Sequence, residues 1–347
     1  MAVRRIPSFY HLVGDNMKLF DKKGYFNAKE VIESKYNFIF VTGARGIGKT
    51  YSTLLYLINK GEPFIYLRRT QDESDLQANE NTSSITKVLH ACKCDYKFTK
   101  LSKKVGCIYV NDEPLIYTCA LSTFASIRGI NFDNVNYAIY DEFITEPHVR
   151  TFKAEGLALT NFYESVNRNR EFEEDKPPLK LICLSNSLNI ANDIFMEFDL
   201  ISDAERLTST GVEVFTRNST LLIIIQNSPI SKKKAKTSLY NNASEEYARM
   251  AIKNEFILND FTYVKKVNIK EYSCILNIGA LYLYKHKSRN EYYCTFIKAN
   301  TKRKYKTSIS DLERFQRAEW RYYIKYLDGY IRFDSYKAIA LFEKYFK

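Results

Sequence analysis

Short apolar runs alternate with amphipathic stretches along the first two thirds of the chain. Residues 51–61 space their apolar side chains three and four positions apart and end on Gly61, which predicts a helix. Strands that alternate with helices form a parallel sheet, and such sheets bind ligands at the carboxyl ends of their strands. Four apolar runs have the length of buried strands: residues 37–42, 64–69, 136–140 and 179–185.

Other segments extend the same domain. Residues 105–110 and 115–121 alternate like the two strands of a hairpin, and residues 149–172 are mainly helical in pattern. The polar residues 70–84 predict an excursion over the surface. We expect the sheet to continue through residues 212–215 and 221–225.

The last third of the chain has a different make-up. A charged run over residues 231–236 suits a linker, and an amphipathic helix is expected over 243–253. Beyond it, the pattern predicts strands and then helices. The strands are expected over residues 272–284 and 291–299, and the helices over 310–327 and 335–346.

We therefore predict two domains joined by a linker. Residues 1–228 form an α/β domain with a parallel sheet. Residues 229–258 form a partly helical linker, and residues 259–347 form a smaller, basic α+β domain.

The net charge of +12 is concentrated in the last third, where residues 251–347 hold 20 lysines and arginines against 10 acidic residues. A basic module joined to a nearly neutral one predicts a polyanionic partner. A solvated basic face without a partner is the alternative. The longest aliphatic run, residues 221–225, is too short to cross a bilayer, and the first residues lack the apolar segment of a secretion signal. We therefore expect no membrane partner.

The chain has seven scattered cysteines, which we expect to be reduced thiols rather than disulfides. His90, Cys92 and Cys94 alternate along a possible strand and are potential zinc ligands. Because a fourth ligand and Cys-x-x-Cys knuckles are missing, a zinc site is the weaker interpretation.

A phosphate-binding loop is the most specific motif in the sequence, and it stands between a predicted strand and a predicted helix. Its glycines let backbone N–H groups surround a β-phosphate at the helix N-terminus. Lys49 is expected to reach the β- and γ-phosphates, and the Thr50 hydroxyl is expected to bind Mg²⁺. We predict that the chain binds a nucleoside triphosphate through Gly43, Ala44, Arg45, Gly46, Ile47, Gly48, Lys49 and Thr50.

Two acids, Asp141 and Glu142, follow the predicted strand over residues 136–140. A carboxylate at a strand tip beside the loop can hold Mg²⁺ through its water shell, which suits Asp141. A second carboxylate can polarise the attacking water, which suits Glu142. Since a kinase activates a substrate hydroxyl rather than water, the pair favours ATP hydrolysis.

Three further side chains are catalytic candidates. Asn186 follows the strand over residues 179–185 and is either a sensor of the γ-phosphate or a helix N-cap. Transition-state charge on the γ-phosphoryl group needs a cation beyond the loop lysine, and an arginine finger from a neighbouring subunit often supplies it. Arg168 and Arg170 fit that role, with a surface arginine pair as the alternative.

Six segments, in order along nearly the whole chain, resemble the DNA-packaging (encapsidation) ATPases of small phi29-like podophages. One segment alone would be weak, whereas six in register are specific. They cover residues 37–50, 64–69, 141–144, 168–171, 182–186 and 329–334.

This resemblance implies a fold and an assembly. Family members have the additional-strand, catalytic-glutamate type of P-loop NTPase domain, which large terminases share. They form a pentameric ring at the portal vertex of an empty procapsid and drive double-stranded DNA inward using ATP. The family's arginine finger falls on Arg168. Arg128, in an Arg-Gly segment that precedes the Asp-Glu strand, corresponds to a loop near the pore and is the expected DNA contact.

The resemblance also implies a ribonuclease H-like C-terminal domain without its catalytic acids. In the family this domain binds the procapsid, including a procapsid-bound RNA in some members. Two-metal nuclease chemistry needs clustered carboxylates, and no acid lies between Glu271 and Glu291. We therefore expect no nuclease activity.

The expected protein is a ring-forming motor that needs ATP and Mg²⁺ and translocates viral double-stranded DNA into a procapsid. It would act in the cytoplasm of the bacterial host and transiently on the procapsid. One alternative is a terminase-like enzyme with an active nuclease. A second is a nucleic-acid-binding protein whose ATPase acts only as a switch. A small-molecule kinase is disfavoured by the basic second domain.

Overall fold

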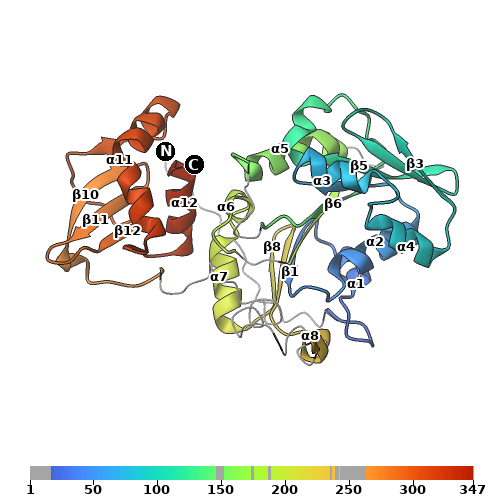
Figure 1. Cartoon of the computed structure of the whole chain (residues 1–347), viewed down its shortest axis with the longest axis horizontal. Coiled ribbons are helices and arrows are strands. Elements are labelled where there is room, and N and C mark those ends of the chain that lie inside the picture. The colour runs from blue at the N-terminus through green and yellow to red at the C-terminus, as the bar shows by residue number, and fades with distance from the viewer. Residues whose placement is uncertain are drawn as a thin grey trace. The chain divides into compact units, whose positions relative to one another are not determined.

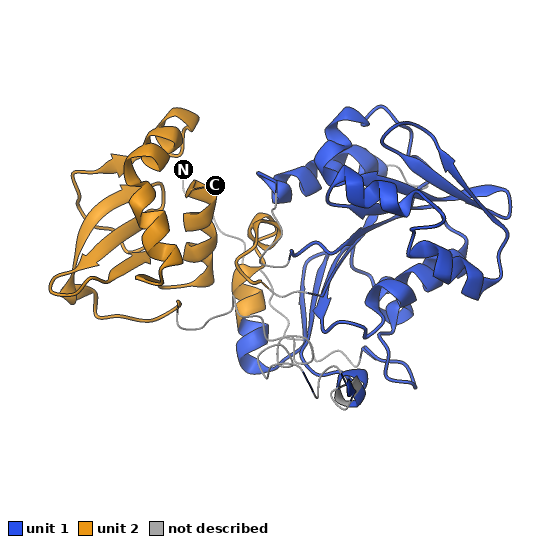
Figure 2. Ribbon diagram, in the orientation of Figure 1, with its two compact units in different colours: residues 1–188, 206–256 blue, residues 189–205, 257–347 orange. Residues whose placement is uncertain are grey.

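The fold comes from a computed structural model that describes residues 17–145, 152–172, 176–186, 189–234, 237–238, 242 and 263–346. The chain divides into two compact units, one of residues 1–188 and 206–256 and the other of residues 189–205 and 257–347 (Figure 2). The helix expected over residues 243–253 lies outside the described residues. The domain boundaries at residues 228 and 258 stay predictions.

The first unit is an α/β arrangement around one large sheet (Figure 1). Its strands are β1 (Phe38–Gly43), β2 (Phe64–Arg68), β3 (Tyr96–Lys100), β4 (Gly106–Val110), β5 (Glu113–Ala120), β6 (Tyr137–Asp141), β7 (Lys180–Ser185), β8 (Val214–Arg217) and β9 (Thr220–Ile225). Its helices are α1 (Ala28–Ile32), α2 (Lys49–Lys60), α3 (Gln71–Gln77), α4 (Ile85–Cys92), α5 (Glu155–Asn167) and α8 (Pro229–Lys234), with 3₁₀ turns η1 (Leu121–Ser126) and η2 (Arg170–Phe172). Helices α6 (Asp193–Glu197) and α7 (Ile201–Thr210) stand between β7 and β8 in the sequence.

Among the described residues, the strand order is β3-β4-β5-β2-β6-β7-β1-β9-β8. Strands β5, β2, β6, β7, β1 and β9 run parallel. At one edge β4 pairs antiparallel with β5 and β3 antiparallel with β4, and at the other edge β8 pairs antiparallel with β9. The predicted parallel sheet is therefore confirmed. Strand β7 separates β1 from β6, so one strand stands between the phosphate loop and the Asp141 tip.

Alternating side chains of the strands build cores on both faces of this sheet, as the two-residue repeat requires. Ile39 and Val41 of β1 join a buried cluster with residues of α1, α2 and α4. Phe38 and Phe40 point to the other face, where the ring of Phe38 meets Tyr163 of α5 at 4.6 Å. Figure 1 shows α2 and α4 on one side of the sheet and α5 on the other. Both faces are covered, which explains why the parallel strands are apolar throughout.

The polar stretch over residues 70–84 contains helix α3 and the capping residue of α4, and only Ser74 and Ser83 in it are buried, in agreement with the predicted surface excursion. Thr70 caps α3 by accepting a hydrogen bond from the backbone N–H of Glu73. The predicted hairpin of β4 and β5 is confirmed, but β5 also pairs in parallel with β2 and so belongs to the central sheet. The helix expected over residues 149–172 is shorter, covering α5 and η2 in the described part.

The cysteines are free thiols, as predicted; the structure describes all seven of them. The strand expected through His90, Cys92 and Cys94 is wrong, since α4 ends at Cys92. Its buried residues, Ile85, Val88 and Leu89, follow the helical period. The His90 ring nitrogen Nε2 lies 2.7 Å from the hydroxyl of Tyr96. In the described part of the chain, no group of three potential metal ligands is found.

The second unit contains a mixed sheet whose order, in the part described, is β13-β10-β11-β12-β14. β10, β11 and β12 form an antiparallel meander, and β13 and β14 add to its two edges in parallel. The elements are η3 (Ile269–Glu271), β10 (Tyr272–Ile278), β11 (Leu281–His286), β12 (Tyr292–Thr295), β13 (Lys304–Tyr305), α11 (Ile309–Leu327), β14 (Ile331–Phe333) and α12 (Tyr336–Phe346).

The single strand expected over residues 272–284 is wrong, because Gly279 turns the chain between β10 and β11. The two predicted C-terminal helices are confirmed as α11 and α12. They pack together beside the sheet (Figure 1). Phe315 and Phe346 meet in this core with ring centroids 4.6 Å apart. None of the helices in the described residues has the length and apolar character that a membrane span requires.

Gly279 and Gly329 form a matched pair for testing the turn. Both have positive φ, at +52° and +76°. A Cβ on Gly279 would lie 2.7 Å from Thr307 Cγ2 and 2.8 Å from the Tyr345 hydroxyl, whereas the nearest atom to one on Gly329 is 3.9 Å away. We expect Gly279→Ala to lower the free energy of unfolding by about 2–4 kcal/mol and Gly329→Ala by about 1 kcal/mol. Trp320, the single tryptophan, lies in α11, so its fluorescence during urea unfolding reports on this unit. Equal losses would contradict the close packing at Gly279.

Candidate nucleotide-binding site

The predicted phosphate loop lies between β1, which ends at Gly43, and α2, which begins at Lys49. Gly46 and Gly48 have φ of +72° and +89°, a conformation that glycine adopts at little cost. Gly48 is the N-cap residue of α2 and, as a glycine, has no side-chain oxygen that could cap the helix. The backbone of the loop therefore has the turn that a phosphate-binding loop needs, and it ends at the positive end of a helix dipole.

Lys49 is buried, with 4% of its surface exposed. Its Nζ donates hydrogen bonds to the carbonyls of Gly43 at 2.7 Å and Ala44 at 3.0 Å, and to Oδ1 of Asn186 at 3.1 Å. The loop thus closes around its own ammonium group. The structure brings Asn186, just beyond β7, into contact with the loop, as its place after a neighbouring strand predicted.

Asp141, at the end of β6, is the second buried charge of the site. Its Oδ1 accepts a hydrogen bond from the Thr50 hydroxyl at 3.0 Å, and its Oδ2 accepts one from the Tyr66 hydroxyl at 2.6 Å. Burial raises the pKa of Asp141 above its ordinary value, while Arg68 and the two hydroxyls act against that shift. The Thr50 hydroxyl and the Asp141 carboxylate are adjacent hard oxygen donors, the ligand type that Mg²⁺ prefers.

Glu142 follows Asp141 with a left-handed backbone, φ +58°. Its carboxylate is half exposed and pairs with Arg68 of β2, the Nη2 to Oε2 distance being 2.8 Å. Arg68 Nη1 also lies 3.4 Å from Oδ2 of Asp141. Burial alone would lower the pKa of Arg68, but Tyr66 and the neighbouring carboxylates raise it above its ordinary value. Arg68 therefore clamps both acids as a permanent cation.

A buried ion pair holds the backbone beneath these acids. Arg69 donates to the carbonyls of Glu142 at 2.8 Å and Phe143 at 3.0 Å, and its Nε donates to Glu155 of α5 at 2.8 Å. The Tyr140 hydroxyl donates to the same Glu155 oxygen. Arg69 and Glu155 are each 3% exposed. Arg68, Arg69 and Glu155 were not predicted as contributors to the site. The signal in the sequence was that two arginines directly follow the apolar residues 64–67.

Arg168 and Arg170 have different environments. Arg168 is half exposed, ends α5 with φ +49° and donates to Asp133 Oδ1 at 3.0 Å. Arg170 is buried and donates to the carbonyls of Phe132 at 3.3 Å and Asp133 at 3.0 Å. Arg170 therefore anchors the turn that presents Arg168, and the arginine-finger hypothesis fits Arg168 alone. Within one chain Arg168 is paired with Asp133 rather than with the phosphate loop.

Arg128, the predicted DNA contact, is exposed just after η1. The turn between β3 and β4 lies beside η1, because Lys104 Nζ donates to the Ser126 hydroxyl at 2.8 Å. That turn also carries the exposed Lys103. Arg128 follows two residues after Ser126, the residue through which η1 contacts this turn.

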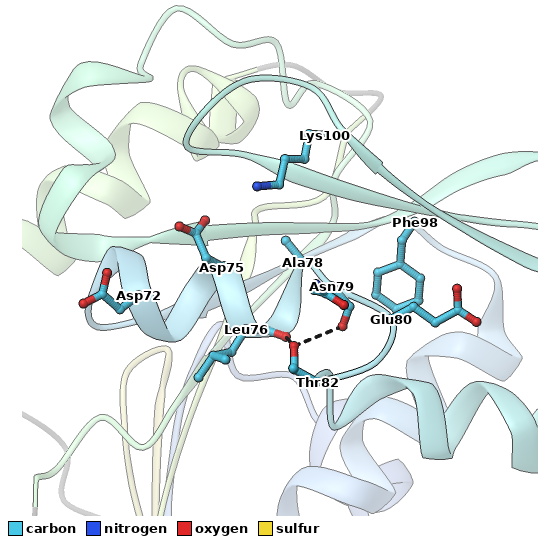
Figure 3. A pocket seen from close by; sticks show the side chains of 9 residues that line it. All are labelled: Asp72, Asp75, Leu76, Ala78, Asn79, Glu80, Thr82, Phe98 and Lys100. Carbon is cyan, nitrogen blue, oxygen red and sulfur yellow. Dashed lines mark hydrogen bonds between the residues drawn. The ribbon is translucent and has the colours of Figure 1, made fainter.

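A separate hollow of about 630 Å³ lies between α3 and β3. Asp72, Asp75 and Glu80 contribute acids to it, and Lys100 points from β3 toward Asp75 (Figure 3). Its lining includes none of the predicted site residues, so this hollow is distinct from the phosphate loop.

Comparison with protein families places the chain among packaging proteins. The profile of the family described as "Podovirus DNA encapsidation protein (Gp16)" matches residues 20–342. The DNA packaging proteins of Bacillus phages PZA and phi29 are each 25% identical to this chain over 334 residues, which is 91% of this chain and 95% of each relative.

Solved structures show the same fold along nearly the whole chain. One is described as the Phi-28 gp11 DNA packaging motor, with a TM-score of 0.63 and 18% identity. It matches 93% of this chain and 97% of its own. Another is described as the bacteriophage Phi-29 viral genome packaging motor assembly, with a TM-score of 0.62 and 23% identity. It matches 93% of this chain and 99% of its own.

Breaking the buried ion pair of Arg69 with Glu155 should lower the free energy of unfolding far more than breaking the exposed pair of Arg168 with Asp133. Glu155→Ala leaves a buried guanidinium without its carboxylate, so we expect the free energy of unfolding to fall by about 3–5 kcal/mol. Asp133→Ala removes a half-exposed partner and should cost less than about 1 kcal/mol. Urea unfolding followed by far-ultraviolet circular dichroism measures both. A loss at Glu155 as small as that at Asp133 would show that the buried pair does not stabilise the site.

Proposed function

The chain belongs to the podovirus DNA encapsidation protein family, and from that premise we propose that it is the ATP-hydrolysing motor that drives viral double-stranded DNA into a preformed procapsid. One observation carries the proposal. Lys49 and Thr50 of the phosphate loop are within hydrogen-bond distance of Asn186 and Asp141, which lie at the tips of β7 and β6. A loop lysine, a hydroxyl and a strand-tip acid are the groups that hold a magnesium nucleoside triphosphate.

ATP binding would exchange the internal partners of the loop for phosphate oxygens. The carbonyls of Gly43 and Ala44 are neutral acceptors for the Lys49 ammonium, so negatively charged phosphate oxygens would replace them. Thr50 and Asp141 are the residues that would hold Mg²⁺, which when bound neutralises charge on the β- and γ-phosphates. The donor set fits that ion, since both groups are hard oxygens and the burial of Asp141 favours a cation beside it.

Glu142 is the proposed general base. Its carboxylate must leave Arg68 to accept a proton from the attacking water, because an oxygen paired with a guanidinium at 2.8 Å is a weak base. Arg68 is therefore a positioning residue that keeps Glu142 inactive until the site rearranges. Arg69 holds the carbonyl of Glu142 throughout, so the side chain can move while the backbone stays.

The position of β7 supports an additional-strand, catalytic-glutamate P-loop NTPase domain. It lies between β1 and β6, and Asn186 follows it. The Asn186 amide thus stands between the loop lysine and the acids, where it can sense the γ-phosphate. When the Lys49 ammonium moves to the phosphates, its hydrogen bond to Asn186 would be lost, and the Asn186 amide would become available to the γ-phosphate.

The arginine finger is proposed to act between subunits. Arg168 is half exposed on a turn that Arg170 anchors, so it is available to a neighbouring chain once Asp133 releases it. A site completed by a neighbour requires a head-to-tail interface, and such an interface forms a ring when its rotation closes. The resemblance to phi29-like packaging ATPases supports five subunits on the portal of the procapsid.

DNA contact is proposed to be mainly with phosphates, because a packaging motor must accept any sequence. Arg128 and Lys103 are exposed cations suited to that contact. The basic second unit is proposed to dock on the procapsid or on a procapsid-bound RNA.

We also propose that the second unit is ribonuclease H-like without nuclease activity. Its Asp334 carboxylate already accepts hydrogen bonds from the Thr295 and Ser335 hydroxyls and from the backbone N–H of Phe296. The proposed site of action is the cytoplasm of the bacterial host.

Removing the proposed base tests the hydrolytic assignment. Glu142→Gln should retain ATP binding while DNA-stimulated hydrolysis falls by about 10²–10⁴-fold, because the amide cannot accept the water proton. Phosphate release and binding of a non-hydrolysable ATP analogue measure the two effects separately. Glu113→Gln, an exposed acid on β5, is the control and should behave as the wild type. Near-normal turnover by Glu142→Gln would exclude this residue as the base.

Mixing variants tests the finger between subunits. Arg168→Ala alone should lose at least about 10³-fold in hydrolysis, since the transition-state charge is left without its cation. Adding Glu142→Gln subunits, which supply an intact Arg168, should restore measurable hydrolysis at interfaces where both intact halves meet. Arg317→Ala, an exposed arginine of α11, is the control for loss of a surface charge. Absence of any recovery would rule out a finger supplied by the neighbour.

A further inference from the structure

Two tyrosines near the phosphate loop have no part in the chemistry described so far. Tyr25 is 42% exposed and Tyr51 is 47% exposed. Tyr51 directly follows Thr50 in the first turn of α2, and Tyr25 lies in the segment before α1. Large aromatic surfaces left half open beside a ligand site are available for stacking.

Tyr25 is tied to the loop itself. A Cβ added to Gly48 would lie 3.3 Å from Cδ1 and 3.6 Å from Cβ of Tyr25, so the ring lies directly against the glycine. The backbone N–H of Phe26 donates to the carbonyl of Ile47 at 2.9 Å. Gly48 and Tyr51 are three residues apart and so share one side of the first turn of α2. Tyr25 and Tyr51 therefore border the same part of the loop.

The turn that carries Tyr25 is held from both ends. Asp21 Oδ1 accepts hydrogen bonds from the backbone N–H groups of Lys23 and Tyr25, both at 2.9 Å. Gly24 has φ +89°, and a Cβ there would lie 2.8 Å from Cβ of Pro229. Pro229, the first residue of α8, therefore packs against this turn. These contacts hold the segment that carries Tyr25.

The route of a nucleotide through the loop leads to these rings. Backbone N–H groups of the loop hold the α- and β-phosphates, with the γ-phosphate toward Lys49 and the acids. The remainder of the nucleotide must leave the loop on the opposite side, past Thr50 and the first turn of α2. On the basis of the nucleotide site proposed above, we propose that Tyr25 and Tyr51 form the base-binding platform, with the Tyr25 ring stacked on the purine and Tyr51 bordering the ribose. Because stacking uses the face of the base, this platform recognises a planar base and separates adenine from guanine only weakly.

Calorimetric titration with two ligands separates base contacts from phosphate contacts. The full chain is titrated in Mg²⁺ with a non-hydrolysable ATP analogue and with inorganic tripolyphosphate, which has no base. Tyr25→Ala and Tyr25→Leu should lower the affinity for the ATP analogue by about tenfold, the effect of losing one aromatic stack, and leave the affinity for tripolyphosphate unchanged. Tyr25→Phe, which keeps the aromatic ring, should retain the wild-type affinity for the ATP analogue. Tyr51→Ala should lower that affinity by less than Tyr25→Ala does. Leu101→Ala, an exposed apolar residue between β3 and β4, is the control.

The outcomes distinguish this inference from the function it rests on. Tyr25→Leu keeps apolar contact with Gly48, so it remains informative if Tyr25→Ala does not fold. An equal loss for both ligands would mean that Tyr25 shapes the loop rather than binds the base, and an unchanged affinity for the analogue would also overturn the platform. Failure of the wild-type chain to bind either ligand would overturn the nucleotide site itself. An exchange of the ATP analogue for its GTP counterpart should change the affinity little.

Discussion

The buried carboxylate of Asp141 is the constraint around which the first unit is organised. Burial disfavours its charge and raises its pKa, yet it lies at the tip of β6 within reach of the phosphate loop. Its stabilising partners come from other elements: Thr50 from α2, and Tyr66 and Arg68 from β2. In the observed strand order, β2 lies beside β6, and β7 stands between β6 and β1, the strand that leads into the loop. A carboxylate held in this way is costly without a cation and favourable with one.

The same arrangement separates a fixed part of the site from a movable part. Arg69, Tyr140 and Glu155 form a buried network that holds the backbone carbonyls of Glu142 and Phe143. The Glu142 side chain, in contrast, is half exposed and pairs with Arg68. Its left-handed backbone persists because the buried network below it is strong. A rigid backbone and a side chain that can be released suit the proposed role of Glu142 as a base that is inactive until the nucleotide is in place.

Much of this could be predicted from sequence because its signals are local. The phosphate loop, the Asp141-Glu142 pair and Asn186 each follow an apolar run in the sequence. Each run is a parallel strand, so these residues lie at the carboxyl ends of β1, β6 and β7, as predicted. Arg69 and Glu155 could not be paired from sequence, because they are 86 positions apart and a buried ion pair leaves no periodic pattern. The turn at Gly279 could not be predicted, because the strands on both sides of it are apolar and merge into one run in the sequence. Arg168 and Arg170 look alike in sequence, and only the carbonyls that surround Arg170 separate an anchor from an exposed cation.

The exposed cation also explains why one chain is an incomplete enzyme under the proposed function. Arg168 is held with φ +49° at the end of α5, and its guanidinium is paired with Asp133. A half-exposed pair of this kind is weak, so a more concentrated negative charge can displace Asp133 at little cost. The γ-phosphate of a neighbouring subunit is such a charge. The phosphate loop, Asp141 and Glu142 then need a second copy of the same chain for full transition-state stabilisation, and hydrolysis becomes conditional on assembly. With this coupling, hydrolysis in one subunit depends on the position of its neighbour, so that the subunits of a ring can hydrolyse ATP in a coordinated way.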